Sequence, residues 1–395
     1  MISVLGWITL SIVGLIMGFF FICSVIGIFK KIFIKRKYIM LILILLAFMI
    51  SGLSFFLEPA PDSDLSRYYS LLDESRGQTI RYFFTDFKYK SAPITTIWFY
   101  FVSLIGNNHF LPTLPTLITF GIVFYICYDF YLNKTNQNFA YFCLCYLCIF
   151  SFTEIIFFMT TVRYCTAAAF VLLAIYRDVY KQKHNWLTIL IYCFPLLIHN
   201  NVILLLTIRL LCLINLKFLN VIFLLSCTML QLCAKLLQLS KKNKLIKIGD
   251  LLIGYVNMDP IDNRYVACIC VMSMLLLMLY FLNYYLKCKK NDRKYFVYNF
   301  YNDAQFKRNY THMNYCMALI GFNFCSQLIR RINVVALPLG FSVLYDYLDI
   351  VDAKIVSNTK FKILRIFSLI CIFIITIGMF VYQAFGLKMW RLCSV

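Results

Sequence analysis

The sequence predicts an all-α polytopic membrane protein with about twelve transmembrane helices and one re-entrant or interfacial helix. Only 14% of the 395 residues are charged, and the mean hydropathy is positive. Apolar runs long enough to cross a hydrocarbon core of about 30 Å recur along the chain. Because no linker, low-complexity tail or second domain separates them, we expect a single transmembrane domain over residues 1–395.

The first basic loop sets the orientation that we expect. It lies between apolar runs at about 3–29 and 38–57 and contains Lys30, Lys31, Lys35, Arg36 and Lys37. Basic residues favour cytoplasmic loops, so 58–94 is predicted to be an outer loop. No Lys or Arg precedes Lys30, unlike the basic start of a signal peptide, so we expect the first run to remain as a span with its N-terminus outside.

The later runs give the other spans. We expect full spans at 111–132, 265–286, near 333–348 and at about 361–384. The run Pro93–Ile105 is too short to cross the membrane as a helix and is predicted to be re-entrant or interfacial. Residues 139–180 are too many for one helix, and we expect two helices with an outer turn at Thr160–Arg163.

Residues 186–214 leave two interpretations. They form either one long tilted span or two shorter spans that turn at His199–Asn201. The second interpretation places the strongly basic loop 287–311 in the cytoplasm, and we prefer it for that reason.

The charge and the cysteines exclude two other classes of protein. The net charge of +21 comes mostly from short loops between spans, so we expect no nucleic-acid partner. Most of the 17 cysteines lie in apolar runs, where free cysteine behaves as a small hydrophobic residue. The four histidines form no metal-binding motif, and we expect neither a metal nor another cofactor.

Polar residues from separate segments meet at one depth on this topology. The outer face is predicted to carry Asp62, Asp64, Arg67, Arg163, His199, Arg330 and Arg331. Arginine forms forked hydrogen bonds with phosphoryl oxygens, so these arginines suit a lipid-linked phosphate or pyrophosphate. A nearby carboxylate or histidine is a candidate base for an attacking hydroxyl. Tyr68 and Tyr69 are candidates for stacking on sugar rings.

Each of these residues also has a structural interpretation. Asp62, Ser63 and Asp64 form a suitable helix N-cap. The tyrosines suit an interfacial aromatic belt, and Arg163 suits an arginine that extends to the interface. His199 could cap a helix end, and Arg330–Arg331 could be a membrane anchor. Glu154 is predicted to lie within an apolar helix, where it needs a partner.

Four motifs in chain order carry a resemblance over about residues 58–345. They are Asp-Ser-Asp-Leu-Ser-Arg-Tyr-Tyr at 62–69, Thr-Thr-Val-Arg-Tyr-Cys-Thr-Ala-Ala-Ala at 160–169, Pro-Leu-Leu-Ile-His-Asn-Asn at 195–201 and Arg-Arg-Ile-Asn-Val-Val at 330–335. The chain resembles the EpsG-like branch of the Wzy-type polysaccharide polymerases of bacterial capsule, exopolysaccharide and O-antigen assembly. It departs from the family pattern at Tyr164, where Gln is frequent, and at Asn200–Asn201.

The resemblance implies a metal-independent membrane glycosyltransferase with a GT-C-like fold in the bacterial cytoplasmic membrane. Its donor and acceptor would be undecaprenyl-pyrophosphate-linked oligosaccharides at the outer face, with a flippase and a chain-length regulator as possible partners. Arg163, Arg330 and Arg331 become candidate pyrophosphate clamps. Asp64, Asp62 or His199 becomes the acceptor base, and we prefer Asp64. The further substrate-binding candidates are Arg67, Tyr68 and Asn200.

Two other functions stay open at the level of the sequence. A flippase or transporter of lipid-linked oligosaccharides would carry charged residues along a path through the membrane. A membrane acyltransferase that modifies the polysaccharide commonly uses a histidine within a span as its base, and His199 leaves that function open.

Overall fold

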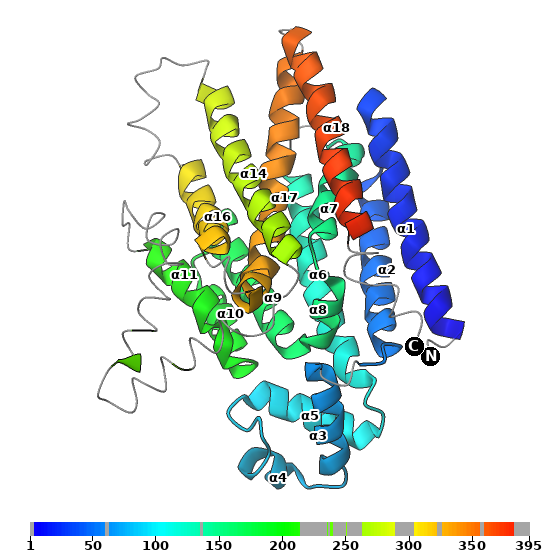
Figure 1. The fold of residues 1–395 in the computed structure, drawn as a ribbon, viewed down its shortest axis with the longest axis vertical. Coiled ribbons are helices and arrows are strands. Elements are labelled where there is room, and N and C mark those ends of the chain that lie inside the picture. The colour runs from blue at the N-terminus through cyan, green and yellow to red at the C-terminus, as the bar shows by residue number, and fades with distance from the viewer. Residues whose placement is uncertain are drawn as a thin grey trace. The chain divides into compact units, whose positions relative to one another are not determined.

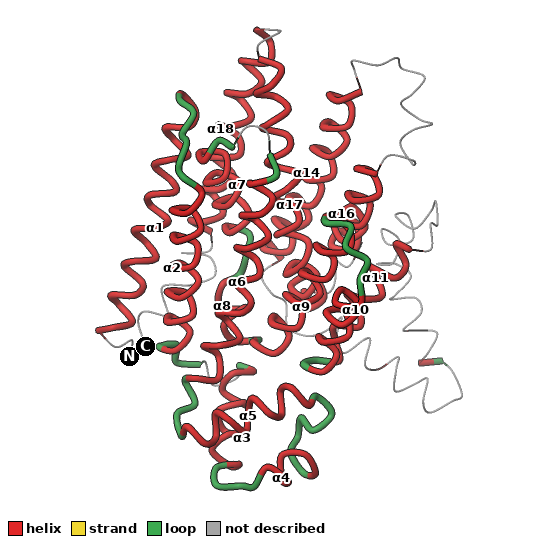
Figure 2. The backbone as a smooth tube through the Cα atoms, turned by 180° about the vertical axis from the view of Figure 1, so that it is seen from behind, coloured by secondary structure: helices red, strands yellow, loops and turns green. Residues whose placement is uncertain are grey.

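The computed structural model describes residues 4–59, 63–134, 137–213, 235, 238–239, 250, 263–288, 304–321, 326–355 and 359–382. The described backbone is helical and contains no strand (Figure 2). The chain divides into two compact units, one formed by residues 1–203 and 351–395 and the other by residues 204–350. Each unit is described by itself.

The first unit contains most of the helices (Figure 1). Its α-helices are α1 (Val4–Phe29), α2 (Arg36–Phe55), α3 (Asp64–Ser75), α4 (Ile80–Thr85), α5 (Pro93–Ile105), α6 (Phe110–Leu132), α7 (Phe139–Ser151), α8 (Ile155–Thr160), α9 (Val162–Ile175), α10 (Trp186–Cys193) and α18 (Thr359–Val381). A π-helix, η1 (Tyr176–Tyr180), extends α9, and the 3₁₀-helices η2 (Phe194–Leu197) and η3 (Asn200–Val202) follow α10. Helix α6 packs against α2 and α9, and α7 packs against α1 and α18.

The second unit contains nearly all of α11 (Ile203–Leu213), together with α14 (Asn263–Cys288), α16 (Ala304–Gly321) and most of α17 (Ser326–Ile355). Interhelical hydrogen bonds hold it together. Tyr315 Oη donates to the Leu205 carbonyl at 2.6 Å, and the Asn283 amide donates to the Val343 carbonyl at 3.1 Å. Such bonds are typical of helices packed in an apolar environment, where polar groups find partners on neighbouring helices.

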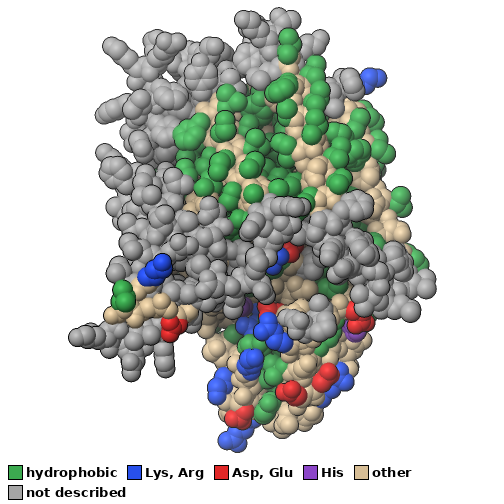
Figure 3. Space-filling view, viewed as in Figure 1, with side chains coloured by type: hydrophobic (Ala, Val, Ile, Leu, Met, Phe, Trp, Pro, Cys, Tyr) green, Lys and Arg blue, Asp and Glu red, His purple; other side chains and the backbone are tan. Residues whose placement is uncertain are grey.

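The helices agree with the prediction of an all-α membrane protein. Five described helices contain a segment long and apolar enough to cross a membrane: Ile8–Gly27, Arg36–Phe55, Phe110–Leu132, Tyr265–Asn283 and Leu328–Asp352. In the first unit, α1 and α18 present apolar side chains such as Leu15, which is 74% exposed, and Ile374, which is 62% exposed. Charged side chains gather instead over α3–α5 (Figure 3).

Helices α3–α5 form a layer beyond the end of α2 and the start of α6 (Figure 1). Helix α5 begins with Pro93 at its first turn and ends at Gly106, whose φ of 75° is a left-handed conformation that favours glycine. Its 13 residues extend about 20 Å, less than the ~30 Å hydrocarbon core. The predicted outer loop 58–94 thus contains the helices α3 and α4, and α5 is a separate short helix.

Two helix boundaries differ from the prediction. Residues 139–180 form α7, α8 and α9 instead of two helices, because the chain breaks at Phe152–Glu154 as well as at Thr161. At the first break, Ser151 and Thr153 donate their hydroxyls to carbonyls of the preceding turn, a bond that competes with the helix. Glu154 therefore precedes α8 and does not lie inside an apolar helix, as the sequence suggested.

The span expected near 333–348 is longer than predicted. Helix α17 begins at Ser326, so Arg330 and Arg331 lie within the helix and not in a turn before it. Helix α16 likewise begins at Ala304, inside the predicted basic loop 287–311. Part of that loop, residues 289–303, lies outside the described residues.

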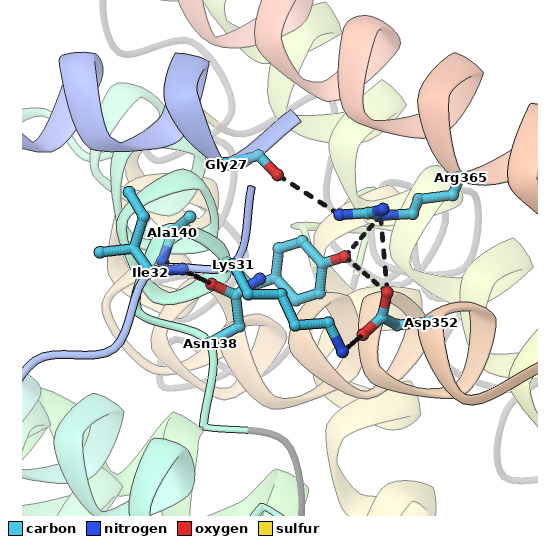
Figure 4. A network of polar contacts seen from close by, with 8 residues as sticks. Gly27, Lys31, Ile32, Asn138, Ala140, Asp352 and Arg365 are labelled. Carbon is cyan, nitrogen blue, oxygen red and sulfur yellow. Dashed lines mark hydrogen bonds and ion pairs between the residues drawn. The ribbon is translucent and has the colours of Figure 1, made fainter. Parts of the chain in front are cut away.

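A buried ion network joins four segments of the first unit (Figure 4). The Asp352 side chain is 4% exposed, and its Oδ2 lies 2.5 Å from Lys31 Nζ. Its Oδ1 accepts from Tyr141 Oη at 3.3 Å and lies 3.6 Å from Arg365 Nε. Arg365 also donates to Tyr141 Oη at 2.7 Å and to the Gly27 carbonyl at 3.4 Å. The network connects the end of α1 to α7, α17 and α18.

Gly27 lets α1 approach α7 closely, and we expect Gly27→Ala to lower stability. A Cβ on Gly27 would overlap the Cβ of Ala140, so the helices must separate, at a cost of about 1–3 kcal/mol. A Cβ on Gly18 in the same helix meets nothing within 4 Å. Gly18→Ala should therefore raise stability by up to about 1 kcal/mol. Thermal unfolding in detergent measures both variants, and an equal rise for both would contradict the close approach.

Removing Asp352 should destabilise the protein by about 3–5 kcal/mol, because Asp352→Ala leaves two cations without their buried anion. The matched control is Asp73→Ala. Asp73 pairs with Arg76 at 3.1 Å, but its side chain is 57% exposed, so the pair should contribute about 1 kcal/mol or less. Comparable losses of melting temperature in the two variants would show that the Asp352 network contributes no more than a surface pair.

Candidate functional site

Helix α3 begins with a side-chain cap that positions Asp64. Ser63 is the N-cap residue, and its Oγ accepts from the Ser66 amide at 3.1 Å. Asp64 is therefore the first residue of the helix, where the positive end of the helix dipole favours a carboxylate. Capping does not explain Asp64, because Ser63 performs that role. Asp62 lies outside the described residues.

The Asp64 carboxylate forms an ion pair with Arg67 one turn later. Arg67 Nη2 donates to Asp64 Oδ1 at 2.5 Å. The Asp64 side chain is 40% exposed and that of Arg67 is 65% exposed, so both reach solvent. A substrate that approaches this end of α3 can contact either group.

Tyr68 is buried behind this ion pair. The residue is 5% exposed, and its ring centroid lies 5.7 Å from those of both Tyr89 and Phe99. Its ring therefore supports the layer, and a role in stacking on a sugar does not fit this burial. Tyr69 is also enclosed, with its ring 5.6 Å from the ring of His109.

Arg163 lies in the first turn of α9, after the predicted break at Thr161. Its Cζ is 3.7 Å from the centroid of the Tyr89 ring and 5.6 Å from that of Tyr68. Within the described part of the chain, its buried Nε and Nη1 atoms have no hydrogen-bond acceptor. Buried donors without acceptors are costly, and an anionic ligand that accepts from them would remove that cost.

The charges of Asp64, Arg67 and Arg163 shift the pKa values of Tyr68 and Tyr89. Burial, the largest cause, raises the pKa of Tyr89, and the nearby Arg163 guanidinium lowers it. The charge of Asp64 raises the pKa of Tyr89, and the charge of Arg67 and a hydrogen bond with Arg163 lower it. Burial likewise raises the pKa of Tyr68 above its usual value, with smaller effects of the same three charges. Both phenols are therefore neutral at physiological pH, and the cluster contains two arginines for one carboxylate.

His199 lies between η2 and η3, so the helices of 186–214 are interrupted at the expected position. Thr95 of α5 donates to the Ile198 carbonyl at 2.7 Å and holds this segment on α5. The centroid of the His199 ring lies 5.6 Å from that of Tyr164 in an edge-on arrangement. Tyr164 directly follows Arg163 in the sequence. Asn200 is exposed.

The capping bond of His199 fixes its tautomer. Its Nδ1 accepts from the Asn201 amide at 3.1 Å, so a neutral ring carries its proton on Nε2. In that form Nε2 can donate a hydrogen bond but cannot accept a proton. This tautomer disfavours His199 as the acceptor base and leaves Asp64 as the better candidate among the described residues.

The first unit therefore brings together Asp64, Arg67, Tyr68, Arg163 and the His199 segment. Arg330 and Arg331 are half-buried on α17 and belong to the second unit. Among the residues that the structure describes, no group of three or more His, Cys, Asp or Glu side chains could hold a metal ion.

Sequence reasoning missed Tyr89. It lies between Lys88 and Lys90 in a loop of mixed charge, and no pattern distinguishes it from other tyrosines in an aromatic chain. Its backbone position is nevertheless well defined, because its carbonyl accepts from the Thr96 hydroxyl and the Ala92 amide, both at 2.8 Å.

We expect Asp64→Asn to leave the fold nearly unchanged. The pair with Arg67 is exposed, so its loss should cost about 1 kcal/mol or less. Ser63→Ala removes the N-cap of the same helix and should cost about 1 kcal/mol. Melting temperatures in detergent compare the two, and a much larger loss in Asp64→Asn would assign the carboxylate a structural role.

Comparison of the chain with protein-family models, curated proteins and solved structures found no match. The functional interpretation therefore depends on the geometry of the cluster and on the motif resemblance.

Proposed function

We propose that the protein is a membrane glycosyltransferase that polymerises undecaprenyl-pyrophosphate-linked oligosaccharide repeat units at the outer face of the bacterial cytoplasmic membrane. The product would be a capsular polysaccharide, an exopolysaccharide or an O-antigen. The observation that carries the proposal is the position of the Arg163 guanidinium on the Tyr89 ring. Two of its buried N–H donors have no acceptor among the residues that the structure describes, and the charges of Asp64 and Arg67 act on the same tyrosine.

Arg163 supplies the donor side of the reaction. The bond between the anomeric carbon and the pyrophosphate breaks, and negative charge develops on the leaving pyrophosphate. A guanidinium that already has donors available stabilises that charge without prior rearrangement. Arg67 adds positive charge nearby.

Asp64 supplies the acceptor side. A hydroxyl of the incoming lipid-linked repeat unit attacks the anomeric carbon, and its proton passes to a base. The pair with Arg67 engages Oδ1 of Asp64, so we assign Oδ2 as the atom that takes the proton. The glycosidic bond forms as the lipid pyrophosphate leaves, and no metal takes part.

The orientation follows from the two ends of α2. Its 20 residues extend about 30 Å, the thickness of a hydrocarbon core. Lys31 and Arg36 lie near its start, and α3 follows its end. These positions and the positive-inside rule support the proposal that α3 lies outside. The proposal includes about twelve spans, a GT-C-like fold and an interfacial α5.

The distribution of charge favours chemistry at one face over transport through the membrane. Helix α2 has no charged residue after Lys37, and Arg163 is the only charged residue of α9. In α6, only Asp129 near the end of the helix is charged. A flippase for a charged lipid headgroup would require polar residues along its path, and the middle of these helices is apolar.

We expect Asp64→Asn and Arg163→Ala each to abolish polymer while single lipid-linked repeat units persist. Loss of one group that stabilises developing charge typically lowers turnover by about 100- to 1,000-fold. Polymer length on gels and extracted lipid-linked oligosaccharides give the readout. Arg81→Ala is the matched control, because Arg81 is an exposed arginine of the same layer.

Three outcomes would oppose the proposal. Long polymer in both variants would remove the assigned site. Repeat units confined to the cytoplasmic side in a deletion strain would indicate a flippase. Polymer of normal length with altered modification would indicate an acyltransferase.

A further inference from the structure

Tyr89 is the centre of an aromatic cluster in the turn between α4 and α5. Its ring centroid lies 5.7 Å from those of Tyr68 and Phe99 and 5.8 Å from that of Phe87. Phe87 also packs against Phe99 at 5.4 Å. The neighbouring rings and the two hydrogen bonds to the Tyr89 carbonyl fix the position of this ring.

The face of the Tyr89 ring holds the Arg163 guanidinium. At 3.7 Å from Cζ to the ring centroid, the cation lies within the range of a cation–π interaction. Such an interaction attracts the charge through the ring quadrupole and does not require an N–H group to point at an acceptor atom. A carboxylate in the same place would accept from the N–H groups and neutralise the cation. An aromatic support therefore leaves Arg163 charged, with donors available.

The carboxylate of Asp64 does not take up the available donors of Arg163. The charge of Asp64 reaches Tyr89, but the Asp64 carboxylate forms its ion pair with Arg67. Arg67 thus compensates Asp64, while Arg163 keeps Nε and Nη1 without an acceptor among the described residues. The arrangement separates one neutralised ion pair from one uncompensated guanidinium.

We propose that Tyr89 is a positioning residue, which holds Arg163 by its ring face and so sets the affinity of the site for the phosphoryl oxygens of a pyrophosphate ester. This inference rests on the proposed function and names the part of the substrate that Arg163 recognises. The proposal assigns this role to the ring face. The Tyr89 hydroxyl also forms a hydrogen bond with Arg163, and Tyr89→Phe tests that contribution separately.

Binding of inorganic pyrophosphate to the full-length protein in nanodiscs tests the inference without polymerisation. The rise in melting temperature with pyrophosphate concentration gives an apparent Kd. Tyr89→Phe should stay within about twofold of the unchanged protein, because the ring face is retained. Tyr89→Leu should weaken binding about tenfold, and Arg163→Ala should remove it.

Phe87→Leu is the matched control. Phe87 belongs to the same cluster and is 1% exposed, whereas the rings that Arg163 lies over are those of Tyr89 and Tyr68. Its loss should lower stability as Tyr89→Leu does, with pyrophosphate affinity near that of the unchanged protein. In polymerisation assays, Tyr89→Leu should raise KM for the lipid-linked donor, and Tyr89→Phe should restore it.

The inference is overturned if the unchanged protein does not bind pyrophosphate, or if Tyr89→Leu binds it normally. It is also overturned if Tyr89→Phe is as weak as Tyr89→Leu, or if Phe87→Leu weakens binding equally. The proposed function is tested separately. Asp64→Asn and Arg163→Ala strains that still make long polymer would remove the assigned polymerase site, whereas the measured binding of pyrophosphate would stand.

Discussion

A charge that leaves water must be compensated, and the first unit meets this requirement differently at the two ends of α2. Near its start, Asp352 lies between Lys31 and Arg365, so opposite charges meet directly. Beyond its end, Arg163 lies on the ring of Tyr89. In the first arrangement both cations contact the same carboxylate directly, so each has an anionic partner within the protein. The second remains open, because a ring attracts a cation without taking its N–H groups.

This difference separates a structural role from a chemical one. An ion network whose cations share one buried carboxylate fixes how helices meet. A guanidinium with unused donors is poorly stabilised until an anion arrives, so it is more suited to binding than to holding the fold. The free-energy cost of burying a charge therefore distinguishes the structural ion network from the cluster around Arg163.

Local signals in the sequence predicted part of this structure. The Ser63–Asp64 start of α3, the break before Arg163 and the turn at His199 all follow from residues that prefer helix ends. The break at Ser151 was missed, because in an apolar chain a helix can end without a polar loop. Tyr89 was missed for a different reason. Its role depends on a contact with a residue distant in sequence, and periodicity and composition carry no record of such a contact.

Two adjacent threonines of α5 hold the opposite sides of the cluster. Thr95 donates to the segment that carries His199, and Thr96 donates to the carbonyl of Tyr89. Successive residues of a helix point about 100° apart, so one rigid element of 13 residues sets both positions together. A shift in the position of α5 would displace the His199 segment and Tyr89 together. A change in what the cluster binds would then be easier through exposed positions such as Asn200 than through α5 itself.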